Sequence, residues 1–281
     1  MSIPLTLSPP LAPARRKLAL PAPPSVILSL LIIALIIGWS LAPGLFTSFD
    51  PAIGVPADKL QAPSAAHWFG TDHLGRDLLA RVIHGTASSV SSAMIAVVIA
   101  LVLGGLIGLL AGFLGGWVDV VLARFVDVLL AIPNFLLAVI IVTALGFSTT
   151  NAAIATGISA IAIFARVMRS EVIKTRSATF VEASFLSGGS RWHILTRHVL
   201  PNASRSVLPL AVLRFGYSIL IIASLAFLGY GDPPPASDWG LLISIGKDYL
   251  KWPWAVYAPA IVTVATVLSL NRISRWLRKT E

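Results

Sequence analysis

The sequence contains no cysteine and little charge. Only 12% of its 281 residues are Asp, Glu, Lys or Arg, and none is Cys. Without thiols the chain forms no disulfide bond, no thiolate metal site and no cysteine nucleophile. Charge this sparse also argues against a water-soluble domain, because such a domain draws about a quarter of its residues from the charged types.

Long hydrophobic segments take the place of charge. Hydrophobic residues make up 56% of the chain, and its mean hydropathy is +0.86. A helix that spans a bilayer needs about 20 mostly apolar residues. The apolar segments are Ser25–Ala42, Ser88–Phe113, Val120–Leu145, Ala152–Phe164 with its flanks, Ser206–Leu228 and Trp254–Leu270. We therefore expect an all-α membrane protein with six transmembrane helices.

The basic residues are distributed unevenly around these segments. A net charge of +9 could serve nucleic acid, but that function requires a basic face on a folded soluble region, and the sequence offers none. If the chain begins inside, the inner segments hold Arg15, Arg16, Lys17, Arg124, Arg166, Arg169, Lys174, Arg176, Arg191, Arg197, Arg205, Arg272, Arg275, Arg278 and Lys279, and the outer segments hold Lys59, Arg76, Arg81, Lys247 and Lys251. This asymmetry follows the positive-inside rule. We expect both termini in the cytoplasm, contact with membrane lipid and no nucleic-acid partner.

The apolar segments also divide the chain into regions. We expect a cytoplasmic tail over 1–24, a first transmembrane helix over 25–42, an outer loop over 43–85, a core of five helices over 86–271 and a second cytoplasmic tail over 272–281. In the outer loop, Asp72 is placed to cap an amphipathic helix at the membrane surface, and Gly85 is placed to end it.

The outer loop also holds residues of types that bind metals, namely His67, His73 and His84 with Asp72 and Asp77. An ion pair between Asp77 and Arg81, one helical turn apart, explains the polar face more simply. We therefore predict no metal site.

Three glycines in the second apolar segment share one helical face. Gly104, Gly108 and Gly112 recur at intervals of four residues. Small residues at this spacing let a neighbouring helix approach closely in lipid. We expect them to form a packing surface.

Three residues are candidates for lining a pathway across the membrane. Pro133 bends the third segment, and bent spans often border a pathway. A tolerated kink without a role in transport is an equally good explanation of this proline. Arg214 lies roughly 12 Å past the inner end of its apolar segment by helical rise. Asp127 is a candidate partner for this cation, and extension of the Arg214 side chain towards the inner surface is the alternative.

Residues 229–253 join the last two apolar segments on the outer side. Their prolines forbid one continuous helix, and their apolar and aromatic residues favour a re-entrant loop at the interface. Gly240 to Lys247 does not match a phosphate-binding loop, because five residues separate its two glycines and Asp follows the Lys. We predict no nucleotide site here.

The inner segment 175–202 is predicted to form two short helices. Thr179 and Glu182 fit the capping box of the first, and Gly188-Gly189 ends it. Ser190 is placed to cap the second, and Pro201 to stop it. The two helices carry Phe180, Val181, Phe185, Trp192, Leu195 and Val199. Because this is more apolar surface than water tolerates, we expect a cytosolic partner to cover it.

Glu182-Ala183-Ser184, Gly188, Ile194, His198 and Leu200-Pro201-Asn202 together resemble the EAA loop of ABC importer permeases. Ser184 and Gly189 stand where Ala is common, and both are small. In that family the loop forms a coupling helix that docks into a groove on an ATPase subunit. The resemblance therefore implies a coupling role for Phe180, Glu182, Ala183, Ser184, Phe185, Gly188, Gly189, Trp192, Ile194, His198, Leu200 and Pro201.

Two further motifs are similar to one branch of that family, the dipeptide, oligopeptide and nickel permeases. They are FGTDHLGRDLLARVIHG at Phe69–Gly85 and FLGYG at Phe227–Gly231, followed by Trp239-Gly240, Tyr249-Leu250 and Pro253-Trp254. The match covers about residues 47–270. The end, NRISRWLRKTE, departs from the tail common in that branch.

The resemblance implies a type I ABC importer permease fold with cytoplasmic coupling helices. It also implies a bacterial or archaeal inner membrane, a homologous second permease, two ATPase subunits, and a periplasmic or lipid-anchored solute-binding protein. ATP and Mg²⁺ would bind the ATPase subunits, so this chain would be a non-catalytic subunit without a cofactor.

Peptide is the solute that the branch favours, and nickel or another metal chelate and glutathione are alternatives. A self-sufficient secondary carrier is the rival of a different class, but such carriers show repeated halves or several intramembrane ionisable groups. A membrane-embedded hydrolase would need a nucleophile paired with a base inside the spans. The histidines all lie outside the apolar segments.

Overall fold

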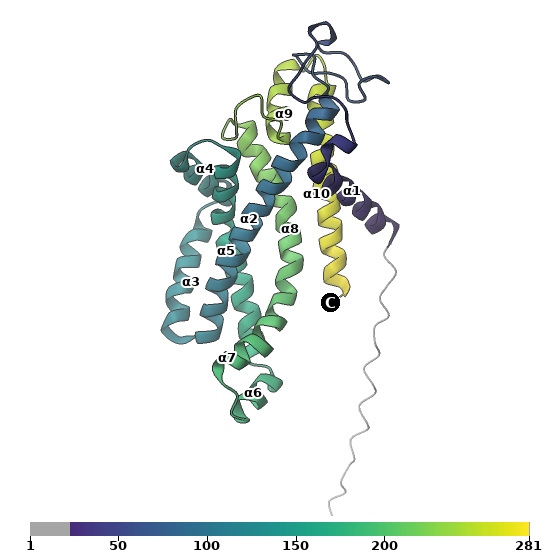
Figure 1. The fold of residues 1–281 in the computed structure, drawn as a ribbon. Helices are drawn as coiled ribbons and strands as arrows, with labels where there is room; N and C mark the ends of the chain where they lie inside the picture. Colours follow the sequence, from purple (N-terminus) through teal and green to yellow (C-terminus); the bar gives the residue numbers. More distant parts are fainter. Residues whose placement is uncertain (1–22, 281) are drawn as a thin grey trace, which may run out of the picture.

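The computed structural model describes residues 23–280, and these fold into one elongated bundle of helices without strands (Figure 1). The tail expected over 1–24 lies outside the described residues except for its last two. The helices are α1 (Pro24–Leu41), α2 (Leu78–Leu114), α3 (Gly116–Ala131), α4 (Asn134–Leu145), α5 (Thr149–Arg176), α6 (Thr179–Leu186), α7 (Arg191–Ile194), α8 (Leu200–Phe227), α9 (Trp239–Gly246) and α10 (Trp254–Thr280). Short 3-10 turns lie at Pro43–Leu45, Pro56–Asp58 and Lys247–Tyr249.

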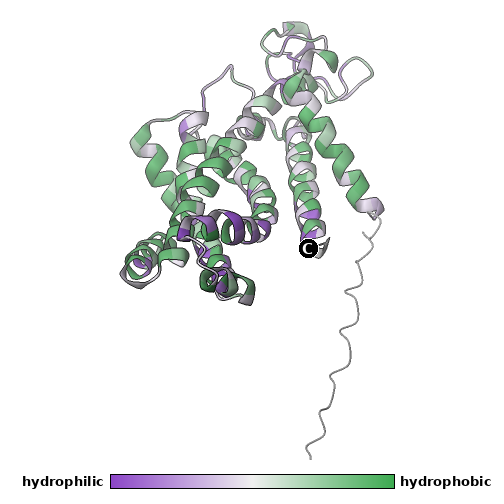
Figure 2. Ribbon diagram, turned by 60° about the horizontal axis from the view of Figure 1, so that its bottom comes forward, coloured by the Kyte–Doolittle hydropathy of each residue, from purple (hydrophilic) through white to green (hydrophobic). Residues whose placement is uncertain are grey.

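Within residues 23–280, five helical segments are long and apolar enough to cross a bilayer, and the number rises to six if α3 and α4 count as one bent span. The five are α1, α2, α5, the segment Arg191–Phe227 and α10. Hydrophobic residues make up most of the helices in Figure 2, and hydrophilic residues gather at the end of the bundle that comes forward in this view. The expected all-α membrane architecture is therefore confirmed.

The third apolar segment is more than kinked. α3 and α4 meet at 90°. Ile132 ends α3 in an extended conformation with φ −92° and ψ 128°, and Pro133 precedes α4. A proline disfavours the helical conformation in the residue before it. Pro133 thus interrupts the helix completely where the sequence predicted a bend.

The glycine face of α2 packs on α5 as predicted. A side-chain carbon added to Gly104 would lie 2.4 Å from the carbonyl oxygen of Ile161, and one added to Gly112 would lie 2.9 Å from that of Arg169. Unbonded atoms do not approach this closely, so only a residue without a side chain fits at these positions. The two backbones therefore run almost in contact along the centre of the bundle.

The separate amphipathic helix expected in the outer loop is absent. Residues from Leu78 onward belong to α2, which begins at the capping residue Asp77 and passes through Gly85 without a break. Gly85 is needed for a different reason than ending a helix. A side-chain carbon there would lie 1.6 Å from the carbonyl oxygen of Ser237, so glycine lets the loop before α9 cross α2.

Two of the expected connecting regions are helical. The tail predicted over 272–281 is the continuation of α10, which ends at Thr280, and Ser274 Oγ donates a hydrogen bond of 2.7 Å to the Pro209 carbonyl of α8. The outer loop 229–253 contains α9, whose capping residue Asp238 accepts a hydrogen bond from the Leu241 amide. Trp239 of α9 is fully buried against α2.

Candidate functional site

Helices α6 and α7 project from one end of the bundle (Figure 1). We call residues 179–199 the elbow. The turn between its helices depends on Gly188, whose φ is +84°, a conformation that glycine adopts without steric cost. Ser190 then caps α7, because its hydroxyl accepts a hydrogen bond of 3.2 Å from the His193 amide. The predicted roles of both residues in the turn are confirmed.

Two other expectations about the elbow are wrong. Ala178 precedes α6 without a side-chain cap, so Thr179 and Glu182 form no capping box. Pro201 does not stop a helix, because it lies within the first turn of α8. A π-helical turn at Leu195–Val199 joins α7 to α8. Residues from Arg191 to Phe227 therefore form one continuous helical rod, and the turn at Gly188 joins α6 to it.

Three buried side chains fix the elbow to the bundle. Val181 of α6, Ile194 of α7 and Val199 of the π turn have no exposed surface. They form one cluster with Val172 of α5 and Val207 of α8. Val181 and Val199, which the sequence analysis placed on the exposed surface, thus hold the elbow in place. Ile194 contributes to the site in the same indirect way.

Other apolar side chains of the elbow remain exposed. Trp192 has 73% of its surface exposed, and Phe180 and Phe185 are also exposed. Leu186 is 89% exposed and was missed by the sequence analysis. The signal in the sequence was its position one helical turn after Glu182, which places Leu186 on the same side of α6 as this charged residue. The elbow is therefore held firmly by buried side chains and leaves several large apolar side chains exposed.

The remaining predicted coupling residues lie on the elbow and at the start of α8. Ala183 and Glu182 are exposed on α6, Ser184 is half-buried, and Leu200 and Pro201 are exposed at the start of α8. A side-chain carbon at Gly189 would lie 2.8 Å from the Ser184 carbonyl oxygen.

His198 joins the two sides of the elbow. Its ring centroid lies 6.2 Å from that of Phe180 and 5.8 Å from that of His193. The side-chain amide of Asn202 donates a hydrogen bond of 2.6 Å to the backbone carbonyl oxygen of His198.

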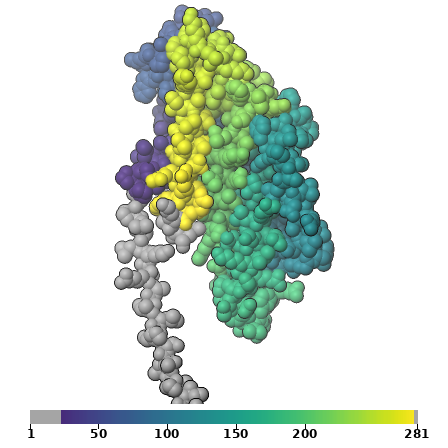
Figure 3. Space-filling model, turned by 180° about the vertical axis from the view of Figure 1, so that it is seen from behind, coloured from purple at the N-terminus to yellow at the C-terminus, as the bar shows by residue number. Residues whose placement is uncertain are grey.

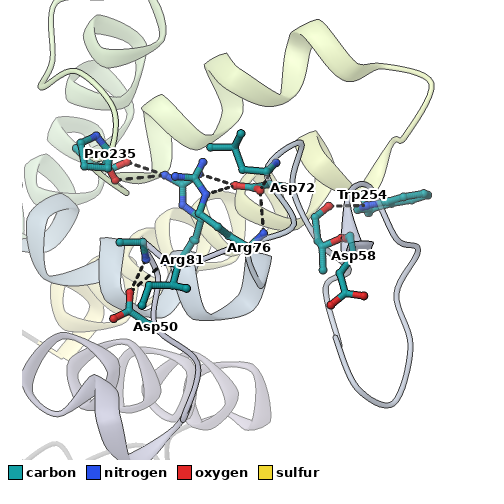
Figure 4. A network of polar contacts seen from close by, with 12 residues as sticks. Asp50, Asp58, Asp72, Arg76, Arg81, Pro235 and Trp254 are labelled. Atoms are coloured by element: carbon teal, nitrogen blue, oxygen red, sulfur yellow. Dashed lines mark hydrogen bonds and ion pairs between the residues drawn. The ribbon is translucent and has the colours of Figure 1, made fainter. Parts of the chain in front are cut away.

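A buried ion-pair network lies at the opposite end of the bundle (Figure 4). We call Asp72, Arg76 and Arg81 the outer clasp. One carboxylate oxygen of Asp72 lies 2.7 Å from Arg76 Nε and 2.9 Å from Arg81 Nη1. Arg81 also donates a hydrogen bond of 2.8 Å to the Ala236 carbonyl. The clasp therefore ties the outer loop to the segment before α9.

The outer clasp replaces two predicted interactions. Asp72 caps no helix, and Arg81 does not pair with Asp77, which instead caps α2 and contacts His67 Nδ1 at 2.8 Å. Burial alone would raise the pKa of Asp72, but hydrogen bonds from the Arg76 and Leu74 amides and the charge of Arg76 together lower it. Asp72 is thus held as a carboxylate.

The histidines near the clasp do not converge on one point. Burial lowers the pKa of His73 against the opposing effect of Asp72, and its ring stacks on Tyr249 with centroids 5.0 Å apart. No group of three metal-binding side chains occurs within residues 23–280.

The three predicted pathway residues lie apart. Asp127 pairs with Arg166 at 2.9 Å, and both side chains are more than half exposed. Pro133 marks the break between α3 and α4. Arg214 lies on α8 with its guanidinium 5.3 Å from the Tyr217 ring centroid. Of the two alternatives for Arg214, the pairing with Asp127 is therefore wrong.

Comparison with known proteins relates this architecture to a transport family. Residues 104–280 match the family model described as binding-protein-dependent transport system inner membrane component. The chain is 39% identical to the dipeptide transport system permease protein of Alkalihalophilus pseudofirmus, over 90% of this chain and 83% of that protein. It is 35% identical to the probable D,D-dipeptide transport system permease protein of Escherichia coli K12, over 92% and 86% respectively.

A third relative is named for another small peptide. The glutathione transport system permease protein of Pectobacterium atrosepticum is 34% identical, over 79% of this chain and 74% of that protein. The chain spans most of each of these relatives.

Solved structures share the fold at low sequence identity. An inward-facing methionine ABC transporter aligns with a TM-score of 0.59 and 15% identity, over 73% of this chain and 98% of that chain. An amino acid ABC transporter aligns with a TM-score of 0.56 and 17% identity, over 72% and 94%. The fold, the elbow and the matched sequence lead to one assignment. The chain belongs to the inner-membrane permease components of binding-protein-dependent ABC importers.

Proposed function

We propose that this chain forms half of the translocation pathway for peptides or similar small solutes, and that its elbow receives the force of ATP hydrolysis from a partner subunit. The observation that carries the coupling role is the exposure of three aromatic side chains of the elbow: Trp192 is 73% exposed, and Phe180 and Phe185 are also exposed. Large aromatic side chains at the centre of an exposed patch are typical anchors of protein interfaces.

The mechanical connection of the elbow supports the same role. Residues from Arg191 to Phe227 form one continuous helical segment. The fully buried side chains of Val181 and Ile194 anchor the elbow to the bundle. Because packed side chains do not deform continuously, displacement of the elbow is transmitted along α8. A partner that moves the elbow therefore moves the apolar part of the bundle.

The complex that this role requires has several further members. We propose a homologous second permease, two ATPase subunits that hold ATP and Mg²⁺, and a periplasmic or lipid-anchored solute-binding protein. The distribution of basic residues supports cytoplasmic termini and a cytoplasmic elbow in a bacterial or archaeal inner membrane. This chain is then the non-catalytic subunit.

The names of the relatives support a peptide-like solute, because they specify a dipeptide, a D,D-dipeptide and glutathione. Import of a nickel or other metal chelate is the alternative within the same branch. A self-sufficient secondary carrier is the alternative of another class. It predicts uptake without ATPase subunits.

Exchange of Trp192 for Ala tests the coupling role. We expect Trp192→Ala to reduce co-purification of the ATPase subunits and ATP-dependent uptake at least tenfold, because the largest exposed anchor is lost. Trp117→Ala is the matched control, since Trp117 is 77% exposed on α3 but lies outside the elbow. Equal behaviour of the two variants would refute the docking assignment. Full uptake without any ATPase subunit would favour the secondary carrier.

A further inference from the structure

Arg214 is a cation deep within an apolar helix. It lies roughly 12 Å beyond Ser206, where the apolar segment of α8 begins, by helical rise. Arginine side chains reach the membrane surface when they lie near helix ends. At this depth the guanidinium needs a partner inside the membrane, because a charge without one is costly in a medium of low dielectric constant.

No carboxylate of this chain provides that partner among the described residues. Helices α8, α9 and α10 contain neither Asp nor Glu. The two carboxylates of α3 pair elsewhere, Asp119 with Arg169 and Asp127 with Arg166. Arg214 Nε is buried without a hydrogen-bond acceptor among residues 23–280. Within these residues the guanidinium contacts the Tyr217 ring but has no ion-pair partner.

A groove lies farther along α8. Its first lining residue on this helix, Leu220, comes six residues after Arg214, and Tyr217 lies between the two in the sequence. Leu220 and Ser224 line a groove of about 370 Å³ between α8, α9 and α10. Thr263 of α10 adds a second hydroxyl to its wall. Figure 3 shows α10 lying beside α8 along the bundle. A volume of this order suits a small solute.

We propose that Arg214, supported by Tyr217, binds the carboxylate of the solute as it moves along α8. The inference rests on the proposed function, because peptide-like solutes carry a free carboxylate. A guanidinium binds a carboxylate through two parallel hydrogen bonds, and the surrounding apolar helices strengthen this attraction. The site would select solutes with a carboxylate over neutral ones after the binding protein has released them.

The test uses the complete complex in proteoliposomes, with its solute-binding protein. Uptake is measured for a dipeptide with a free carboxylate and for the same dipeptide with a C-terminal amide, each at a concentration that saturates the binding protein. We expect Arg214→Gln to lower uptake of the acid form at least tenfold and to leave uptake of the amide unchanged. Arg214→Lys should retain part of the acid uptake, because it keeps the charge but not the paired donors.

A second measurement does not use the dipeptide with the C-terminal amide. ATP hydrolysis stimulated by the binding protein should persist in Arg214→Gln, so fewer acid molecules are imported per ATP hydrolysed. Arg205→Gln is the control, because Arg205 is an exposed arginine of the same helix and should leave this ratio unchanged.

Four results would overturn the inference. Equal loss of uptake for both dipeptides would show that Arg214 does not recognise the carboxylate, and so would unchanged uptake of both. Loss of the second permease from purified Arg214→Gln complexes would show that the guanidinium forms an ion pair with an acidic residue of that subunit instead of binding the solute. Wild-type complexes that import neither dipeptide would overturn the proposed peptide function itself, and the carboxylate site with it.

Discussion

A side-chain carbon added to Gly108 would lie 2.3 Å from the carbonyl oxygen of Ala165. The contact joins α2 to α5, the two helices at the centre of the bundle. Without a hydrophobic drive between helices in lipid, such close backbone packing is a main source of their association. The glycine is therefore a requirement of the helix pair.

Exchange of Gly108 for Ala should destabilise the protein. The added carbon forces the two helices apart, and overpacking of this kind costs about 1–3 kcal/mol. We expect a lower midpoint of thermal unfolding in detergent. Gly105→Ala is the control, since its added carbon would meet the flexible Met168 side chain at an ordinary 3.7 Å. Equal shifts for both variants would contradict the importance of the α2–α5 contact.

Exchange of Gly188 for Val should uncouple the transporter without preventing membrane insertion. Gly188 has φ +84° and open space around its Cα, so the cost is conformational, about 1–2 kcal/mol for a residue with a side chain. Relief of this strain would change the angle between α6 and α7. We expect ATP hydrolysis stimulated by the binding protein to fall at least tenfold in reconstituted complexes.

Gly116→Val controls for backbone strain in that experiment. Gly116 also has positive φ, +57°, and open space, but it is the first residue of α3. Unchanged coupled hydrolysis in Gly188→Val, or an equal loss in Gly116→Val, would refute the role of the elbow turn.

Exchange of Asp72 for Asn should strongly destabilise the outer end of the bundle. The change is nearly isosteric but leaves the buried Arg76 and Arg81 without their shared carboxylate. Removal of one partner from a buried ion pair costs about 3–5 kcal/mol. We expect faster proteolysis of the outer loop and a lower unfolding temperature.

Asp127→Asn provides the comparison, because its pair with Arg166 is largely exposed and exposed pairs contribute about 0–1 kcal/mol. A loss of stability in Asp127→Asn as large as in Asp72→Asn would show that burial does not set the energy of these pairs.

The outer clasp should also give stability a dependence on pH. The pKa of Asp72 in the folded protein lies below its usual value of 3.8. Its contribution to stability is therefore complete above pH 3.8 and is lost as pH falls through the folded pKa. Unfolding measured across this acidic range should show a smaller loss of stability in Asp72→Asn, which has no carboxyl group to protonate. Identical pH profiles for the two proteins would exclude the clasp as the cause.

Local signals in the sequence were reliable where one segment decides the outcome. The long apolar segments gave helices of spanning length, and the glycine interval gave the face of α2 that packs on α5. Gly188 and Ser190 were recognised as a turn and a cap because φ preference and side-chain capping are properties of a few neighbouring residues.

The same local reasoning failed where distant segments compete for one residue. Gly85 was interpreted as a helix end because its neighbour in space, Ser237, is far away in the sequence. Arg81 was assigned to Asp77, one turn away, but the backbone brings Asp72 and the carbonyl of Ala236 to its guanidinium. Val181 was placed on the exposed surface because α5 and α8, which bury it, do not appear in its local pattern.

The amino-acid sequence by itself determined that this protein is a bundle of membrane-spanning helices and, through its motifs, which family it resembles. These properties follow from hydrophobicity and from short-range conformational preference, which act within one segment. Only the tertiary structure decided which charges pair, how completely Pro133 divides the third span, and that α7 is continuous with α8. Those outcomes depend on packing between segments far apart in the chain, where burial and hydrogen bonding with distant partners outweigh local preference.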